Sequence, residues 1–267
     1  MKFADAHIHL SDPEYLPILD KIIGDAKKSN VVALVSNSMD LETSKRSIQL
    51  AKKNPGLVFA AIGIHPWNAQ RLTEDELETT LEFIRNLNEE SKRHVVAIGE
   101  IGLDSMYAMK EEQQKFQRQI FNEMLRLAEE LSLPAIIHSR GTASEIAETL
   151  TSYNLRKVLF HWFSTPRELI PELIGRGYYI SEGPPVLYSK RIRENIKAIP
   201  IENLLTETDG PVRFWGPFKG KITTPAFIPL VVEEIAKLKG MKLEETAAQI
   251  YENFINLNLM AELYFNE

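Results

Sequence analysis

The sequence predicts an α/β protein folded as a (β/α)8 barrel, and three observations support this prediction. The chain has 267 residues, a usual length for such a barrel. Short runs of β-branched residues alternate with longer amphipathic segments along the chain. The motifs G-x-G-x-x-G and G-x-x-x-x-G-K-[ST], which favour the competing open, doubly wound sheet, are absent. No linker, repeat or low-complexity tract divides the chain, so we expect a single barrel domain over residues 1–267.

Eight strand–helix units follow one another in this interpretation. Strands are expected near residues 3–9, 31–37, 58–64, 95–101, 134–139, 157–162, 177–182 and 203–208. Helices are expected near residues 14–29, 40–53, 73–91, 110–131, 142–153, 166–176, 188–198 and 226–239, with a last one near 243–264. Capping residues support three of the helix starts, because Thr73 and Glu76 fit a capping box and the pairs Thr165-Pro166 and Thr224-Pro225 place proline at a first turn.

The composition is that of an ordinary soluble globular protein, with 44% hydrophobic and 25% charged residues. There is no cysteine, which excludes disulfides and thiolate metal sites. The amino terminus enters a strand without an apolar signal region, and no apolar stretch approaches the roughly 18 residues that cross a bilayer. We therefore expect a cytoplasmic protein with no membrane partner.

The net charge of −6 argues against a broad basic groove along nucleic acid. It does not exclude a compact site that holds phosphate through metal ions, because bound cations can dominate the local field.

Polar side chains gather where the predicted strands end. These residues are His7 and His9, His65, Glu100, His138, His161, and Glu207 with Asp209, which we expect at the ends of strands one, three, four, five, six and eight. In a barrel these strand ends converge on one face, where barrel enzymes place their chemistry. Only one of the six histidines, His94, lies elsewhere, and we expect it on the solvated surface of the opposite rim.

The residue types in this set are those of a metal site. His7 and His9 are two residues apart in a strand, so their imidazoles project from one face and can chelate one divalent ion. Nitrogen and oxygen ligands without sulfur suit Zn, Mn, Co, Ni or Mg.

With these motifs the sequence resembles the TatD-like metal-dependent deoxyribonuclease family of the amidohydrolase-like barrels. The resemblance runs nearly from end to end. It is carried by Asp5-Ala6-His7-Ile8-His9-Leu10, Gly63-Ile64-His65-Pro66, Gly99-Glu100-Ile101-Gly102-Leu103-Asp104, His138-Ser139-Arg140, His161 with Phe163-Ser164, and Glu207-Thr208-Asp209.

The resemblance implies a site for two divalent metals. By similarity, one metal would be held by His7, His9, Glu100 and Asp209, and the other by Glu100, His138 and His161, with Glu100 bridging. Two such ions stabilise the attacking and the leaving oxygen of a phosphodiester displacement. His65 would bind the scissile phosphate or a water on the metal, or else merely cap its strand. Asp209 could also take the proton of the attacking water.

Other residues near the site have open roles. Arg140 would contact phosphate or form a salt bridge with a loop acid, and Glu207 would orient a ligand or contact substrate. Asp5 is expected to orient a ligand or to tie down the barrel, and Asp104 to serve loop structure. Tyr107, Trp162 and Trp215 lie near the expected rim, where packing is favoured over stacking on a base.

The chain departs from the family pattern in loops and caps and not at the expected metal ligands. The departures are Ser105-Met106-Tyr107-Ala108-Met109 where a tyrosine-rich stretch is usual, Gly141 where an acid is usual, Thr223-Thr224-Pro225 for Asn-Glu-Pro, and Asn253-Phe254 for Asn and a small residue. They fall where the substrate pocket would be shaped.

We therefore expect a metal-dependent hydrolase that cleaves phosphodiester bonds in nucleic acid, with DNA as the expected partner. The alternative is an amidohydrolase-type enzyme that acts on an amide, ester, lactone or phosphotriester. Glu100 disfavours this alternative, since many binuclear members of that group bridge their metals with a modified lysine on strand four. A non-enzymatic metal-binding barrel is the third hypothesis, and it would require a missing ligand.

Overall fold

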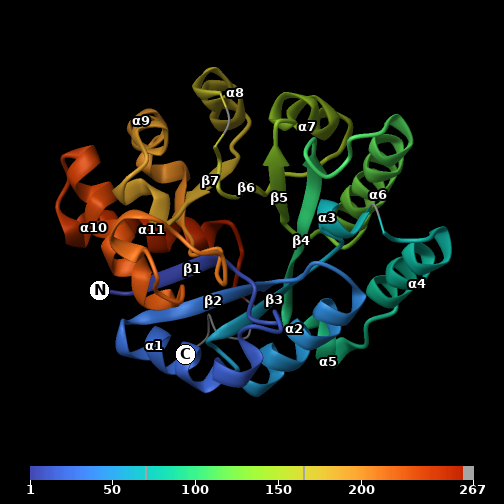
Figure 1. Ribbon diagram of the computed structural model, residues 1–267, viewed down its shortest axis with the longest axis horizontal. Helices are drawn as coiled ribbons and strands as arrows, with labels where there is room; N and C mark the ends of the chain where they lie inside the picture. The colour runs from blue at the N-terminus through green and yellow to red at the C-terminus, as the bar shows by residue number, and fades with distance from the viewer. Residues whose placement is uncertain (70, 165, 261–267) are drawn as a thin grey trace.

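The computed structural model describes residues 1–69, 71–164 and 166–260. Its centre is one sheet of parallel strands in the order β1 to β8, with the helices around it (Figure 1). The strands are β1 Phe3–Ile8, β2 Val31–Asn37, β3 Val58–Ile62, β4 Val95–Asp104, β5 Ala135–Arg140, β6 Val158–Phe160, β7 Tyr179–Glu182 and β8 Leu204–Thr206. This arrangement is a nearly closed barrel, so the predicted fold is confirmed.

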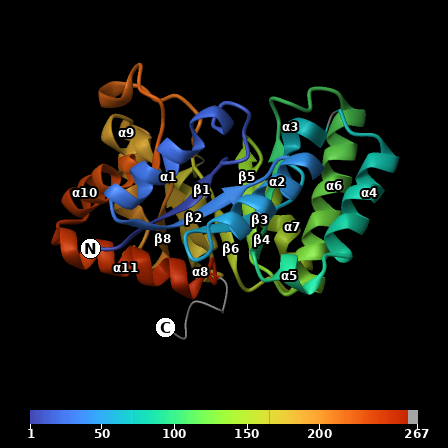
Figure 2. The ribbon, with the colours of Figure 1, turned by 90° about the horizontal axis from the view of Figure 1, so that it is seen from below.

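Helices connect successive strands and form the outer layer (Figure 2). The α-helices are α1 Leu19–Lys28, α2 Leu41–Lys53, α3 Pro66–Ala69, α4 Glu74–Arg85, α5 Glu89–Lys92, α6 Glu111–Glu130, α7 Ala143–Thr149, α8 Ile170–Gly175, α9 Lys190–Ala198, α10 Ile228–Lys239 and α11 Leu243–Asn256. Short 3-10 turns are η1 Leu16–Ile18, η2 Leu150–Ser152, η3 Arg167–Leu169, η4 Pro184–Leu187, η5 Ile201–Asn203, η6 Gly216–Phe218 and η7 Pro225–Phe227. None of the helices in the described part of the chain combines the length and apolar character needed to span a bilayer.

Several predicted boundaries are corrected by the structure. The helix predicted over 73–91 is two helices, α4 and α5, because Asn88 caps a new start by accepting a hydrogen bond from Ser91 N. The predicted capping box of Thr73 and Glu76 is confirmed, as is the cap by Thr224, which accepts from Ala226 N. The last helix ends at Asn256 and not near 264, and residues 261–264 and Thr165 lie outside the described residues.

Strand β4 is longer than predicted and does not end at Glu100. It continues to Asp104, and its pairing with β5 shifts register between Ile98 and Ile101. An irregularity of this kind re-aims the side chains next to it. Gly102 lies directly after the shift with φ +151°, and a Cβ there would meet the carbonyl oxygen of His138 at 2.0 Å. The glycine thus lets β4 approach β5 closely beside the predicted ligand His138.

The apolar core surrounds the strands. The larger cluster packs strand residues such as Leu34 and Ile137 against the helices, including Ile22 of α1 and Phe121 of α6. A second cluster joins strands β1 to β6 and β8 to the end of α11 through Phe254 and other residues. Burying such a side chain contributes about 1.5–3 kcal/mol, so the strand ends are fixed by a rigid scaffold.

The first and last strands meet at a polar seam. Asp5 Oδ1 accepts hydrogen bonds from Thr208 N at 2.9 Å and His7 N at 3.3 Å, and its Oδ2 shares one of 2.5 Å with Thr208 Oγ1. Backbone bonds continue the seam from Asp209 N to the His7 carbonyl and from His9 N to the Gly210 carbonyl, each at 2.8 Å. Of the two roles expected for Asp5, it performs the structural one directly, and the seam that it closes carries His7, His9 and Asp209.

Removal of this carboxyl group should destabilise the barrel. Asp5→Ala leaves buried donors without a partner, and we expect the free energy of unfolding to fall by about 2–3 kcal/mol. In Asp5→Asn the amide oxygen accepts from Thr208 N and the amide NH2 donates to Thr208 Oγ1, so the loss should stay below about 1 kcal/mol. Urea denaturation at pH 5 in EDTA measures both changes, and an equal loss in the two variants would contradict this account of the seam.

The wild type and Asp5→Asn should also differ in how their stability depends on pH. Burial, opposed by the hydrogen bonds from Thr208, raises the pKa of Asp5 from 3.8 to about 8. The folded protein therefore keeps a proton that the unfolded chain loses, and the stability from this proton, present below pH 3.8, is lost as the pH rises toward 8. We expect Asp5→Asn to gain on the wild type between pH 5 and pH 8 in the same denaturation measurement. A constant difference across that range would show that Asp5 is ionised in the seam.

Candidate metal centre

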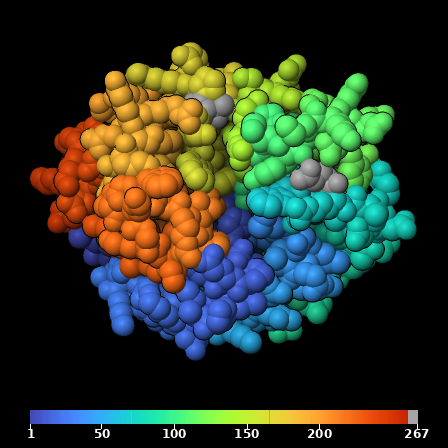
Figure 3. Space-filling model, viewed as in Figure 1, coloured from blue at the N-terminus to red at the C-terminus, as the bar shows by residue number. Residues whose placement is uncertain are grey.

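The loops that follow the strands surround a cleft of about 800 Å³. Figure 3 shows this face hollowed at its centre, where segments from both halves of the chain meet. Among the residues singled out in the sequence, the cleft is lined by the strand-end residues His9, His65, Glu100, His138, His161 and Asp209, and also by Tyr107, Arg140 and Trp162. His7 lies directly beneath them and is fully buried. The structure thus brings together the strand-end residues that the barrel prediction required to converge.

Glu100 lies at the centre of this cluster, and its side chain is almost completely buried. Oε2 is 3.2 Å from His7 Nε2 and 3.4 Å from His9 Nε2. Oε1 is 2.7 Å from His138 Nδ1 and 2.7 Å from His161 Nε2. The two oxygens of one carboxylate therefore face two different groups of imidazoles, as a bridge between two cations requires.

Asp209 completes the first group from the other side of the seam. Its Oδ1 is 3.3 Å from His9 Nε2 and 3.6 Å from His7 Nε2. Asp209 has φ +49°, a left-handed backbone conformation that costs a non-glycine residue about 1–3 kcal/mol. Trp162, which follows His161, has φ +35°. The backbone is thus strained at two positions beside the cluster, where strain commonly serves a functional geometry.

Hydrogen bonds on the side of each ring away from Glu100 fix which ring nitrogens of His9 and His138 have a free lone pair. His9 Nδ1 donates to the Asn37 carbonyl at 3.0 Å, because a carbonyl can only accept, and this leaves Nε2 with its lone pair toward the centre. His138 Nε2 donates to Asp104 Oδ2 at 2.8 Å, which leaves Nδ1 facing Glu100. Both imidazoles are held in the tautomer that suits a ligand.

His65 is held in the opposite sense. Trp67 N donates to His65 Nδ1 at 3.0 Å, so the neutral ring carries its proton on Nε2, which lies 3.1 Å from Glu100 Oε1. Burial, opposed by Glu100, lowers the pKa of His65 to about 4, so the ring is neutral near pH 7. This tautomer makes His65 a hydrogen-bond donor at the edge of the centre and not a metal ligand, and the chain sequence alone could not assign the tautomer.

His161 is backed by Glu207. His161 Nδ1 lies 3.6 Å from Glu207 Oε1, which accepts a hydrogen bond from Trp162 N at 2.9 Å. The other Glu207 oxygen accepts from Ser181 Oγ. Glu207 is only 1% exposed, so of its two expected roles the structure favours orientation of a ligand over contact with substrate.

The electrostatics of the cluster call for positive charge between its members. Burial opposes ionisation of Glu100, but His65, His161 and His7 hold the pKa of its carboxyl well below 4.5. Burial likewise disfavours charge on His161, yet Glu100 raises the pKa of this imidazole well above 6.5. Burial raises and the hydrogen bond with His9 lowers the pKa of Asp209, with a net lowering from 3.8.

These residues fit divalent cations on the chemistry of their donor set. The free lone pair of His9 Nε2 faces Asp209 Oδ1, and that of His138 Nδ1 faces Glu100 Oε1. Each of these contacts is repulsive unless a proton or a cation lies between the two atoms. Three groups place one nitrogen or oxygen atom each within 4.8 Å of the others, namely His7–His161–Asp209, His7–His9–Glu100 and His65–Glu100–His138. In the third group the proton on His65 Nε2 leaves Glu100 and His138 as the metal-binding members. Only nitrogen and oxygen donors take part, which suits the metals expected from the sequence.

Two buried acids near the centre were not assigned these positions from the sequence. Asp104, expected to serve loop structure, does accept a hydrogen bond from Met106 N at 2.8 Å, but its second oxygen orients His138. Glu182 at the end of β7 is fully buried, and among the described residues neither of its oxygens has a hydrogen-bond partner. Burial and the nearby Glu207 raise the pKa of Glu182 well above 4.5. Asp104 belongs to the motif that also contains Glu100, and this was a signal in the sequence for a place near the centre. Glu182 had no such signal.

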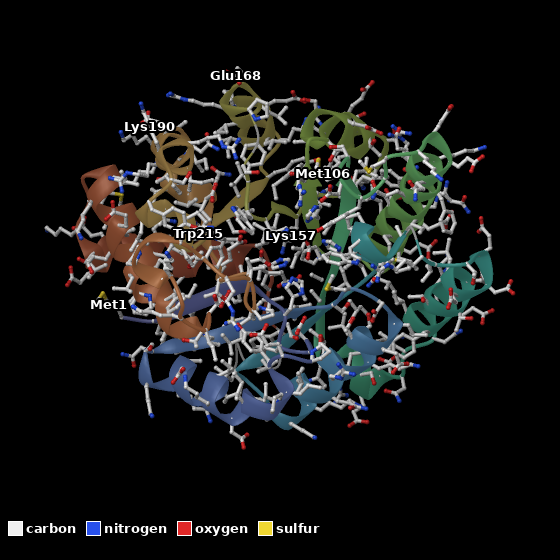
Figure 4. The ribbon with its side chains drawn as sticks, in the orientation of Figure 1. Met1, Met106, Lys157, Glu168, Lys190 and Trp215 are labelled. Atoms are coloured by element: carbon white, nitrogen blue, oxygen red, sulfur yellow. The ribbon has the colours of Figure 1, made fainter. Side chains whose placement is uncertain are left out.

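The remaining candidates lie at the rim. Arg140 is exposed, with Nε 3.9 Å from Asp104 Oδ2 and its guanidinium 5.4 Å from the Tyr107 ring centre. Tyr107 packs on Trp67, and Trp162 packs on Phe214. Trp215 is 66% exposed on the loop after β8, and Figure 4 shows it across the central hollow from Met106. His94 is half-buried just before β4, apart from the cluster.

Comparison with known proteins agrees with this geometry. The profile of the family described as TatD related DNase matches residues 4–258. An uncharacterised metal-dependent hydrolase of Methanocaldococcus jannaschii is 34% identical over 253 residues, covering 95% of each chain. A human deoxyribonuclease is 32% identical and covers 95% of this chain and 93% of its own.

Solved structures lead to the same family. The crystal structure of a TatD homologue from Escherichia coli superposes with a TM-score of 0.86 at 26% identity, covering 96% of this chain and 97% of that one. A TatD-family hydrolase of Entamoeba histolytica superposes with a TM-score of 0.84 at 22% identity, which supports the fold. The family profile covers nearly the whole chain, and the relatives align from end to end. The chain therefore belongs to the TatD family of metal-dependent hydrolases.

Proposed function

We propose that this protein is a deoxyribonuclease that hydrolyses phosphodiester bonds at a centre for two divalent metals bridged by Glu100. The observation that carries the proposal is the division of the Glu100 oxygens, one toward His7 and His9 and the other toward His138 and His161. The deoxyribonuclease name of the human relative supports the choice of substrate. Mg, Mn, Zn, Co and Ni are all compatible with the nitrogen and oxygen donors.

The metal-holding residues divide into two sets in this proposal. His7, His9 and Asp209 would hold one ion and His138 with His161 the other, while Glu100 would give one oxygen to each. Two divalent ions supply stabilisation for the attacking and leaving oxygens of an in-line displacement. Asp5 and Asp104 keep the two sets in position through the seam and through His138.

Three residues would act on the substrate or on the attacking water. His65 is neutral and carries its proton on Nε2 inside the cleft, so it can donate a hydrogen bond to a non-bridging oxygen of the scissile phosphate. Asp209 is ionised and lies at the edge of the cleft, where its carboxylate can accept the proton of the attacking water. Arg140 at the rim can form a forked contact with phosphate.

The direct test is an assay of metal-reconstituted protein on end-labelled single-stranded and double-stranded DNA. We expect cleavage with at least one of the five metals, and a fall in kcat/KM of more than about 100-fold in Glu100→Gln, because even an outer partner of a metal ligand can contribute that much. Glu148→Gln, at an exposed position on α7 away from the cleft, is the matched control and should cleave like the wild type.

The same assay separates the alternatives. DNA that stays intact under every metal, while a simple ester, amide, lactone or phosphotriester is hydrolysed, would replace the nuclease by the amidohydrolase-type activity. Failure to bind any divalent metal at micromolar concentration would contradict both enzymatic functions. Circular dichroism of Glu100→Gln checks that the loss of activity is not a loss of fold.

A further inference from the structure

A second cavity, of about 610 Å³, opens beside the metal cleft. Three of its lining residues, Arg140, Ser164 and Arg191, also line the cleft, so the two cavities adjoin each other. Arg167 completes the cationic side of the cavity. We call Arg140, Arg167 and Arg191 the arginine pocket.

The fold brings these arginines together from three successive connections. Arg140 ends β5, Arg167 begins η3 after β6, and Arg191 lies in the first turn of α9 after β7. The connections that follow neighbouring strands of a barrel lie side by side on its catalytic face. The arginine pocket is thus part of the same rim as the proposed metal centre, on its β5–β7 side.

The arginines of the pocket form no short ion pair within the described part of the chain. Neither Arg167 nor Arg191 has a carboxylate oxygen within 4.0 Å there, and Arg140 has only the long 3.9 Å contact with Asp104. The acid that lines the cavity, Glu194, pairs with Lys197 at 2.9 Å. Gly141 lines the cavity without a side chain. An excess of positive charge therefore faces a concave space on a protein whose net charge is −6.

Exposed arginines are often merely solvated, but these share a cavity that adjoins a hydrolytic centre. Guanidinium groups bind phosphate oxygens through pairs of N–H donors. An arginine without a carboxylate partner does so without first breaking a salt bridge. A nucleic-acid strand carries a phosphate at every nucleotide, so a strand cleaved in the metal cleft brings its next phosphate to a neighbouring site. The chemistry of the pocket matches that phosphate.

We propose that the arginine pocket binds the phosphate next to the one that is cleaved, and so selects a nucleic-acid strand over a small phosphate ester. This inference rests on the proposed phosphodiester cleavage. No base-reading group is needed, because phosphate contacts position a strand without reading its sequence. Arg167 and Arg191 are the residues that distinguish this site from the metal centre.

The test measures strand binding without chemistry. The probe is a fluorescent 12-nucleotide oligothymidine whose phosphates are internal phosphodiesters, titrated in EDTA at several salt concentrations and followed by anisotropy. For Arg167→Ala/Arg191→Ala we expect Kd to rise at least about tenfold, since each charged hydrogen bond contributes a factor of that order. The slope of log Kd against log salt should fall by about 0.7, the value for one lost phosphate contact on a single strand.

Two further variants sharpen the result. Arg156→Ala removes an exposed arginine just before β6, at the opposite end of the barrel, and should bind the oligonucleotide like the wild type. Arg167→Lys/Arg191→Lys keeps the charge but not the fork, so it should restore the salt slope while recovering only part of the affinity. With metal added, the preference in kcat/KM for the oligonucleotide over a nitrophenyl phosphodiester should fall at least about tenfold in the alanine variant.

Failure of this inference can be told from failure of the proposed function. A wild type that cleaves DNA, with unchanged Kd and salt slope in the alanine variant, would overturn the arginine pocket and leave the nuclease intact. A wild type that cleaves no DNA, while the alanine variant loses oligonucleotide binding, would support the phosphate site and reject the nuclease. An equal loss in Arg156→Ala would reduce the effect to overall charge and overturn the inference.

Discussion

A single buried carboxylate, that of Glu100, is the point on which the rest of the site depends. Five imidazoles approach its two oxygens within 3.4 Å, and the side chain is almost free of solvent contact. Five buried imidazoles around one carboxylate can be stable only with positive charge among them, supplied by protons or by cations. The outer hydrogen bonds to His9 and His138 point their free lone pairs inward, which favours cations.

Fold and chemistry share residues at the seam between β1 and β8. Asp5 holds Thr208, and the following residue Asp209 keeps a left-handed backbone beside His9. The strain at Asp209 is sustained because backbone bonds on both strands fix its position. Stability of the barrel and placement of one half of the centre are therefore coupled, and changes at the seam should affect both.

The barrel and most of the centre could be predicted from the sequence, because alternation fixes the topology and the topology makes strand ends converge. Convergence of the strand ends predicts that His7, His9, Glu100, His138, His161 and Asp209 lie together, and the structure places them together; that they hold metal stays a prediction. What the strands do not dictate was missed: the split of the helix over 73–91, the register shift that extends β4 beyond Glu100, and the burial of Glu182. The arginine pocket could not be predicted either, because Arg167 and Arg191 are distant in the sequence and come together only in the folded barrel.

The central claim is that Glu100 joins two cation sites, and a count of bound metal tests it most directly. Native mass spectrometry or plasma emission after equilibration with micromolar Mn or Zn gives the number of ions per chain. We expect two ions in the wild type and fewer than one in Glu100→Gln, because the variant loses a ligand from each site at once. One ion per chain in both proteins would contradict the bridge.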